Sequence, residues 1–220
     1  MLHKRPEVAQ FGVKVPLDDL LADRMVMMQH RFYLPLALLL AEAVATLVPI
    51  YCWNEDYITS FGLCIIRIVV VLHHLFTVNS VAHYWGYRPY NRFQKPTENR
   101  WVNWISMGES FHNYHHVFAW DYRNSEFDWW EYFNPATLFI EVCILLRLAY
   151  EPKKPSSQLI QRVIAHKGTP EYFVDIHRRS LVHRIVLGLL DWAIGLLVAQ
   201  WPMWIVILYK ALSGRPLVVL

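Results

Sequence analysis

The chain has 220 residues, enough for one domain of ordinary size, and its hydrophobic fraction of 55% exceeds that of typical soluble domains. The net charge of +3 is small, and no dense basic run supports nucleic-acid binding. Cys52, Cys64 and Cys143 lie inside apolar blocks and form no CxxC pair, which argues against a disulfide framework and a thiolate zinc site. The apolar residues gather in long blocks, and this layout favours a membrane protein.

The first two apolar blocks predict a transmembrane helical hairpin. Residues 32–53 form a block of 22 residues whose only charge is Glu42, and a membrane-spanning helix needs about 20 residues. A polar turn at 54–60 separates this block from a second one at 61–82. Polar groups inside a membrane helix usually face protein or water, so those of the second block are candidates for function. They are Arg67, His73, His74 and Asn79. We interpret His73 and His74 as a buried, hydrogen-bonded pair rather than as metal ligands.

The distribution of basic residues orients this hairpin. The turn at 54–60 contains no Lys or Arg, whereas the segments before and after the two blocks contain several. By the positive-inside rule, both flanks are predicted to be cytoplasmic and the turn to lie on the opposite side. His83 is then expected at the cytoplasmic mouth of the second helix.

The rest of the chain predicts a cap and a further apolar helix. Residues 84–134 are rich in Trp, Tyr, Asn and Pro, as expected of a cap at the membrane interface. Residues 135–150 are apolar but short for a span, so we expect a helix packed on the cap. Residues 151–179 are polar and basic and predict a cytoplasmic tail or linker. An apolar helix at about 185–209 either crosses the membrane or lies on its surface. The predicted fold class is an all-α membrane protein.

The histidines of the cap carry the chemical prediction. His112, His115 and His116 stand at i, i+3 and i+4, offsets that bring side chains to one helix face. Three clustered imidazoles without cysteine suit metals such as iron and zinc. The alternative is a patch of hydrogen-bonded histidines at the interface. Asn79 and His83, four residues apart, share a helix face at the membrane mouth and are candidates for a polar ligand and a fourth histidine.

Two sequence blocks resemble a known family. NSVAHYWGYRPY (79–90) and GESFHNYHHVFAWDYRNSE (108–126) are similar to blocks of animal stearoyl-CoA, or delta-9 acyl-CoA, desaturases. The resemblance implies that residues 1–168 are the carboxyl-terminal part of a fatty acid desaturase domain. Residues 169–220 form a tail in which no family is recognised.

The resemblance implies a metal centre in the cap. In that family, transmembrane helices lie under a cytosolic cap that holds two iron ions, with histidine boxes as ligands. The ligands carried over to this chain are His83, His112, His115 and His116, with Asn79 acting through water. Leu75 and Phe76 correspond to positions beside the acyl tunnel, and Phe76 stands where the family commonly has Trp. No catalytic residue separate from the metal ligands is expected.

The resemblance also implies the reaction and its setting. The family uses molecular oxygen to introduce a cis double bond, here expected at the delta-9 position, into a fatty acyl-CoA. Electrons come from cytochrome b5 and its reductase. The expected location is the membrane of the endoplasmic reticulum, with several spans and the histidine cap facing the cytosol, in unsaturated fatty acid biosynthesis.

The chain departs from the family pattern in its ligand set. The family's HxxxxH box and first HxxHH box lie in its amino-terminal half, and neither has a counterpart here. Three explanations are open: a fragment of a full enzyme, a catalytically inactive paralogue, or assembly with a chain that supplies the other boxes. Ser110 replaces the second glycine of the usual GEGF, and Trp120 replaces another aromatic residue. A bis-histidine haem protein is a further alternative, although HNYHH in a polar cap fits it poorly.

Overall fold

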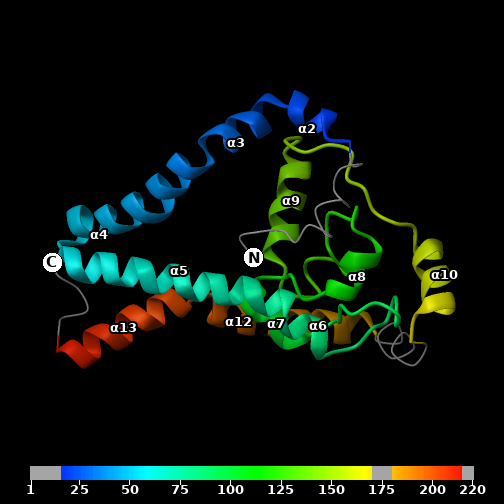
Figure 1. Ribbon diagram of the computed structural model, residues 1–220. Coiled ribbons are helices and arrows are strands. Elements are labelled where there is room, and N and C mark those ends of the chain that lie inside the picture. The colour runs from blue at the N-terminus through cyan, green and yellow to red at the C-terminus, as the bar shows by residue number, and fades with distance from the viewer. Residues whose placement is uncertain (1–15, 170–179, 215–220) are drawn as a thin grey trace. The chain divides into compact units, whose positions relative to one another are not determined.

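The structure, a computed structural model, describes residues 16–169 and 180–214. Residues 1–15, 170–179 and 215–220 lie outside the described residues. The two predicted regions, 1–168 and 169–220, are therefore described only in part. Between these limits the elements are helices (Figure 1). They are α2 (Asp18–Ala22), α3 (Arg24–Ala37), a π-helical segment (Leu38–Val44), α4 (Ala45–Trp53), α5 (Tyr57–Asn79), α6 (Val81–Tyr84), α7 (Arg100–Ser106), α8 (His112–Val117), α9 (Pro135–Leu145), α10 (Ser157–Lys167), α12 (Leu181–Ala199) and α13 (Trp201–Ser213).

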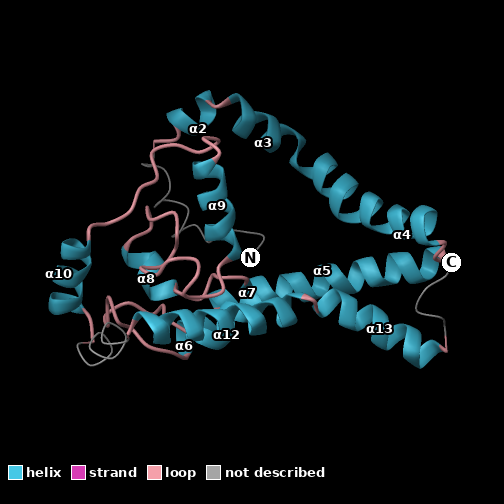
Figure 2. Ribbon diagram, turned by 180° about the vertical axis from the view of Figure 1, so that it is seen from behind, coloured by secondary structure: helices cyan, strands magenta, loops and turns pink. Residues whose placement is uncertain are grey.

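The prediction of an all-α membrane protein is confirmed. In the described part of the chain there is no strand, and the only ladder contacts are isolated bridges that Glu98 forms with Tyr87 and Phe111 (Figure 2). Three continuous helical stretches there are long and apolar enough to cross a membrane. They are Arg24–Trp53, Tyr57–Tyr84 and Leu181–Ala199.

The chain forms two compact units whose boundary, between Ile65 and Ile66, falls within α5. In the first unit, capping residues set the helix starts. The Asp23 carboxylate accepts hydrogen bonds from two backbone N–H groups of α3, so the first long helix begins at Arg24, earlier than the apolar block predicts. Asp56 caps α5 in the same way through the backbone N–H of Thr59. Helices therefore cover both of the first two apolar blocks, and each begins earlier in the sequence than its block predicts.

Polar side chains in the second half of α5, and that of Ser80 directly after it, bond to carbonyl oxygens of α5. Thr77, Asn79 and Ser80 each donate to a carbonyl oxygen three or four residues earlier. His73 Nδ1 lies 2.8 Å from the Val69 carbonyl oxygen. This pattern pairs polar groups inside an apolar helix without another element. His73 is therefore hydrogen-bonded as expected, but it is exposed rather than buried.

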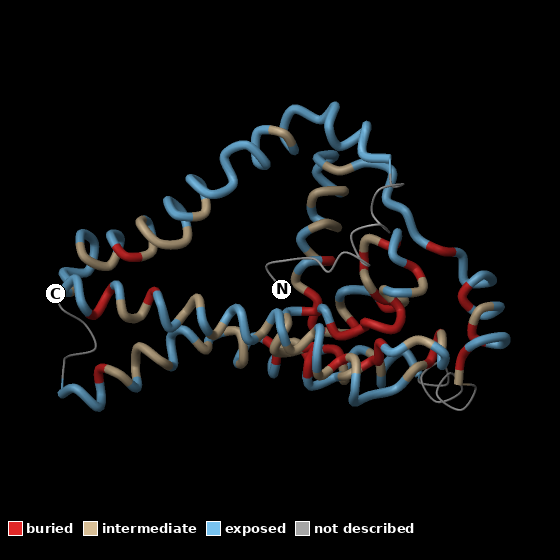
Figure 3. The backbone as a smooth tube through the Cα atoms, viewed as in Figure 1, coloured by how far each residue is buried: buried red, intermediate tan, exposed pale blue. Residues whose placement is uncertain are grey.

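The second unit contains the cap, whose core lies under the loops around α8. Buried residues concentrate there (Figure 3). The core cluster consists of Tyr90, Phe111, Tyr114, Phe118, Phe127, Ile160 and Ile164. The last two come from α10, in the segment predicted to be a tail or linker. They stand four residues apart on one face of α10, and this apolar stripe packs that helix into the cap.

The apolar tail differs from the expected single helix at 185–209. It is divided at Gln200 into α12 and α13, with Pro202 in the first turn of α13. Proline has no N–H to donate and is tolerated in a first turn, so the chain restarts a helix there. α12 packs against α7 of the cap, as both ribbon views show (Figures 1 and 2). The sequence did not predict this contact between α12 and the cap.

Candidate metal centre

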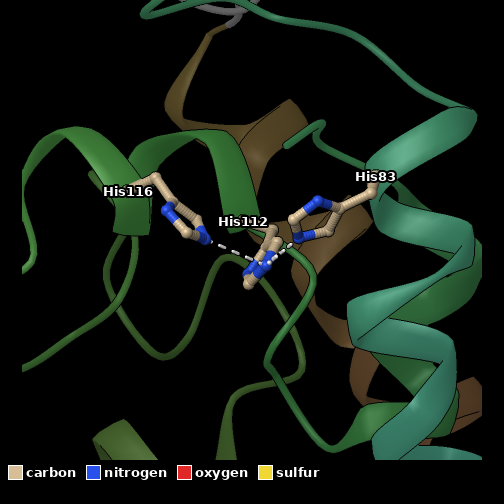
Figure 4. A group of neighbouring side chains, drawn as sticks. All are labelled: His83, His112 and His116. Carbon is tan, nitrogen blue, oxygen red and sulfur yellow. Dashed lines mark hydrogen bonds between the residues drawn. The ribbon is translucent and has the colours of Figure 1, made fainter. Parts of the chain in front are cut away.

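Three imidazoles from two separate segments converge in the cap. His83 lies on α6, and His112 and His116 lie one turn apart on α8 (Figure 4). The Nε2 atom of His112 is 2.8 Å from that of His83 and 3.2 Å from that of His116. One ligand atom from each residue lies within 4.8 Å of the other two. The structure thus brings together three of the four predicted histidines.

These separations fit a single metal ion. Imidazole nitrogens bind zinc or similar ions at about 2.0–2.1 Å, so in a tetrahedral site they stand about 3.3 Å apart. The observed Nε2–Nε2 distances of 2.8 and 3.2 Å are close to that value. Small movements of the rings would place all three Nε2 atoms at binding distance from one ion.

Two of these imidazoles, those of His112 and His116, are kept in the neutral form that binds metal, although only His112 is buried and His116 is exposed. Desolvation, with smaller contributions from the neighbouring rings of His116, His83 and His115, lowers the pKa of His112 to about 4. Desolvation likewise lowers the pKa of His116, with contributions from His115 and His83. Both rings are therefore neutral near pH 7, and the neutral imidazole is the ligating form.

His115 is held differently from the other three. Its Nδ1 lies 2.9 Å from Asn124 Oδ1, and Asn124 Nδ2 in turn donates to Glu109 Oε2 at 3.0 Å. A hydrogen bond at Nδ1 fixes the ring orientation and tautomer and leaves Nε2 as the ligating nitrogen, as is usual for metal-binding histidines. The His115 ring centroid is 5.6 Å from that of His116. His115 stands beside the three-imidazole group without being a member of it.

The residues between the histidines anchor α8 through its other face. Asn113 is fully buried, and its amide makes four hydrogen bonds to the backbone of residues 90–96. Tyr114 is also fully buried, and its hydroxyl donates to Asp121 Oδ2 at 2.7 Å. The HNYHH sequence therefore presents histidines on one side and fixed polar anchors on the other.

Thr97 and Glu98 connect the two segments that carry the histidines. The Thr97 backbone N–H and hydroxyl both donate to the carbonyl of Ala82, next to His83. Glu98 Oε1 accepts from the backbone N–H of Tyr114 on α8 at 2.8 Å. Burial raises the pKa of the Glu98 carboxyl well above its usual range, the Tyr114 N–H acts in the opposite direction, and the charge of Glu126 raises it further. These contacts hold α6 and α8 together.

The remaining predicted site residues lie on α5. The Asn79 amide donates to the Leu75 carbonyl oxygen at 3.2 Å. Leu75 and Phe76 are more than half exposed, and the Phe76 ring makes an edge contact with His73. The roles of these three residues stay predictions.

Sequence reasoning missed the residues that hold the histidines in place. Thr97, Glu98, Asn113 and Asn124 belong to no metal-binding pattern. The sequence did offer one signal for them, because these polar residues stand inside an aromatic-rich segment. A polar group that is buried in such a segment requires hydrogen-bond partners.

The comparisons with known proteins identify the family. A family model described as fatty acid desaturase matches residues 8–134, more than half of the chain. The chain belongs to the fatty acid desaturase family. This confirms the resemblance drawn from the two sequence blocks.

Relatives of this desaturase-family chain include several animal proteins. It is 42% identical over 169 residues to acyl-CoA desaturase 3 of Mus musculus, covering 76% of this chain and 46% of the relative. It is 42% identical over 171 residues to stearoyl-CoA desaturase 2 of Rattus norvegicus, covering 76% and 47%. It is 43% identical over 162 residues to an acyl-CoA desaturase of Cyprinus carpio, covering 73% and 49%. The chain spans about half the length of these relatives.

Proposed function

We propose that the chain forms the carboxyl-terminal part of an acyl-CoA desaturase that uses iron and molecular oxygen to introduce a cis double bond into a fatty acyl-CoA, at the delta-9 position. The observation that carries this proposal is the convergence of the Nε2 atoms of His83, His112 and His116 in a chain of the desaturase family. His115 and Asn79, the latter through water, complete the ligands that this chain contributes.

The gathered imidazoles account for one ion of the proposed pair. Iron sites in oxygenases commonly use three protein ligands and keep positions open for substrates. His83, His112 and His116 supply such a set, and His115 has its Nε2 free of the Asn124 bond. The remaining ligands of a di-iron centre would come from histidine boxes outside this sequence.

The chemistry requires a redox metal. An alkyl C–H bond cannot be attacked by acid–base or nucleophilic side chains, and bound iron supplies oxygen activation. Desolvation keeps His112 and His116 neutral, and the buried anchors of α8 orient the histidines of that helix. Leu75 and Phe76 are proposed to contact the acyl chain, with cytochrome b5 and its reductase as electron donors. The proposed setting is the endoplasmic reticulum membrane with the cap in the cytosol.

Metal content tests the site directly. The chain purified in detergent should retain iron, and His83→Ala, His112→Ala and His116→Ala should each lose most of it. His166→Ala, which changes an exposed histidine at the end of α10, is the matched control and should retain it. A wild-type chain without iron, after expression in iron-rich medium, would contradict the proposal.

Product analysis separates an active enzyme from an inactive desaturase-like membrane protein. Microsomes containing the chain receive stearoyl-CoA, NADH and oxygen, and the fatty acids are measured by gas chromatography. A delta-9 monounsaturated product that depends on His112 supports the active form. Bound iron without product, with and without a co-expressed amino-terminal half of a desaturase, identifies the inactive form.

A further inference from the structure

A buried carboxylate in the middle of α12 has all of its partners in the cap. Asp191 is completely buried. Its Oδ1 accepts hydrogen bonds from Arg100 Nε at 3.0 Å and from Trp104 Nε1 at 2.9 Å, both on α7. Its Oδ2 accepts from the backbone N–H of Phe133 at 2.7 Å. A charge is costly inside an apolar helix, and these donors are what stabilise it there.

The same face of α12 lies close against the cap along its length. Gly188 and Gly195 let the α12 backbone approach, because a Cβ at either position would overlap the Trp130 carbonyl or the Phe133 ring. Trp192 Nε1 donates to the Trp129 carbonyl at 2.7 Å. The contact is thus built from close backbone approach as well as from the ion pair.

A path of buried hydrogen bonds connects Asp191 to the segment that precedes His112. Asp191 binds the N–H of Phe133, and the carbonyl of Phe133 accepts from Asn103 Nδ2 at 2.9 Å. Asn103 Oδ1 accepts from the Ser110 hydroxyl at 2.9 Å. Ser110, the residue that departs from the family's GEGF, stands two positions before His112, and every member of this path is at most 2% exposed.

We propose that Asp191 is a positioning residue for the metal centre: it fixes α7 and Phe133, and through Asn103 and Ser110 it fixes the backbone that presents His112. The proposal rests on the proposed metal-binding function. α12 lies outside the residues that match the desaturase family, so this support belongs to the tail of this chain. The tail is then part of the site's framework.

A second ion pair between α12 and the cap provides a matched control. Arg184 Nε donates to Glu131 Oε1 at 2.6 Å, and Glu131 lies outside α7. Asp191→Asn and Arg184→Gln each remove one charged contact of α12. A general loss of α12 packing would affect both variants equally, whereas positioning through α7 affects only Asp191→Asn.

Hydrogen exchange of the full chain in detergent, read by mass spectrometry, tests the path without metal. Asp191→Asn should speed exchange in peptides covering 107–117, whereas Arg184→Gln should leave them unchanged. Ser110→Ala, which removes the last bond, should reproduce the increase. Equal exchange in Asp191→Asn and the wild type, or equal increases in Asp191→Asn and Arg184→Gln, would overturn the proposal.

Cobalt titration then measures the consequence at the histidines. Asp191→Asn should bind Co²⁺ about tenfold more weakly by visible absorption, as is typical when an outer support of a metal site is lost. The double variant Asp191→Asn/Ser110→Ala should lose less than the sum of the two single effects, since both act on one path. If the loss of Co²⁺ affinity in the double variant equals the sum of the two single losses, the two residues do not act on one path and the proposal is contradicted. A wild-type chain that binds no Co²⁺ rejects the metal site, and the exchange data still decide the role of Asp191.

If Asp191→Asn does not fold, Trp104→Phe replaces it in every comparison. This variant removes one hydrogen bond to Asp191 Oδ1 and keeps an aromatic ring in place. Faster exchange at 107–117 supports the proposal, and unchanged exchange overturns it.

Discussion

Asn124 reaches His115 from a loop, in a backbone conformation with φ of 53° that asparagine tolerates better than most residues. Its side-chain oxygen faces the Nδ1 of His115, and its side-chain Nδ2 donates a hydrogen bond to Glu109 Oε2. At the residue scale, then, the imidazoles owe their orientation to amides and carboxylates that bind no metal themselves. Such partners usually affect metal affinity strongly.

Replacing Asn124 with glycine should weaken Co²⁺ binding about tenfold. Glycine removes the acceptor from His115 Nδ1 without adding strain, because it accepts a positive φ. Asn124→Asp combined with Glu109→Gln keeps the acceptor for His115 without placing two carboxylates side by side, and should stay near wild-type affinity. Isothermal titration calorimetry measures both, and equal losses in the two variants would show that the His115 contact is not the cause.

Replacing Glu98 with alanine should lower the free energy of unfolding by about 1–3 kcal/mol, because the buried N–H of Tyr114 loses its acceptor. Glu98→Gln keeps an acceptor oxygen and removes a carboxyl whose burial is unfavourable, so it should be close to neutral. Thermal unfolding followed by circular dichroism makes the comparison. A glutamine variant as unstable as the alanine variant would refute the role given to this hydrogen bond.

The sequence predicted the histidines but not their supports, for a physical reason. The i, i+3, i+4 spacing places His112 and His116 on one face of α8, because helix geometry is local. The contacts of Asn124 and Asp191 depend on how distant segments pack, and no spacing in the sequence encodes them. Spacing alone also predicted that His115 would join His112 and His116. In the structure Asn124 contacts His115, which lies beside the group formed by the other histidines.

At the scale of elements, helix ends and breaks follow from single residues. Hydropathy placed the first two apolar blocks correctly, but the helices begin earlier because Asp23 and Asp56 cap them. Pro202 divides the expected tail helix. The packing of α12 on the cap was not predicted, because a hydrophobic block does not reveal which of its faces packs on protein. Gly188 and Gly195, seven residues apart on one face, were the signal for close packing.

Replacing Gly188 with alanine should destabilise the cap by about 1–3 kcal/mol, since the added methyl overlaps the Trp130 carbonyl. Gly62→Ala is the matched control on α5, where nothing lies within 4 Å of an added Cβ. The control should be neutral or slightly stabilising, because alanine favours helix. Melting temperatures of the two variants in the same detergent decide the matter. If the Gly188→Ala protein is as stable as the Gly62→Ala protein, α12 does not pack closely against the Trp130 carbonyl.

At the scale of the whole molecule, the charge pattern makes a prediction about sidedness. The turn after α4 lacks basic residues, so we expect it on the side of the membrane opposite the histidine cap. Cys52, exposed near this turn, is a natural reporter. Asp128, exposed in the cap, offers a position for a second one.

Labelling with a membrane-impermeant maleimide tests this topology in sealed microsomes. In a background of Cys64→Ala and Cys143→Ala, Cys52 should react only after the membrane is opened with detergent. With Cys52 also replaced, Asp128→Cys should react in intact microsomes. Labelling of both positions from the same side would contradict the predicted orientation.

The position of Asp191 in the chain has a consequence for synthesis. The guanidinium of Arg100, the indole of Trp104 and the amide of Phe133 leave the ribosome well before the carboxylate that binds them. Until α12 has been made, these donors have no such acceptor, and the α7 region of a nascent chain is incomplete. The framework of the proposed metal site would therefore be completed late in translation, and a chain stopped before α12 would expose an incomplete cap to the quality-control machinery of the cell.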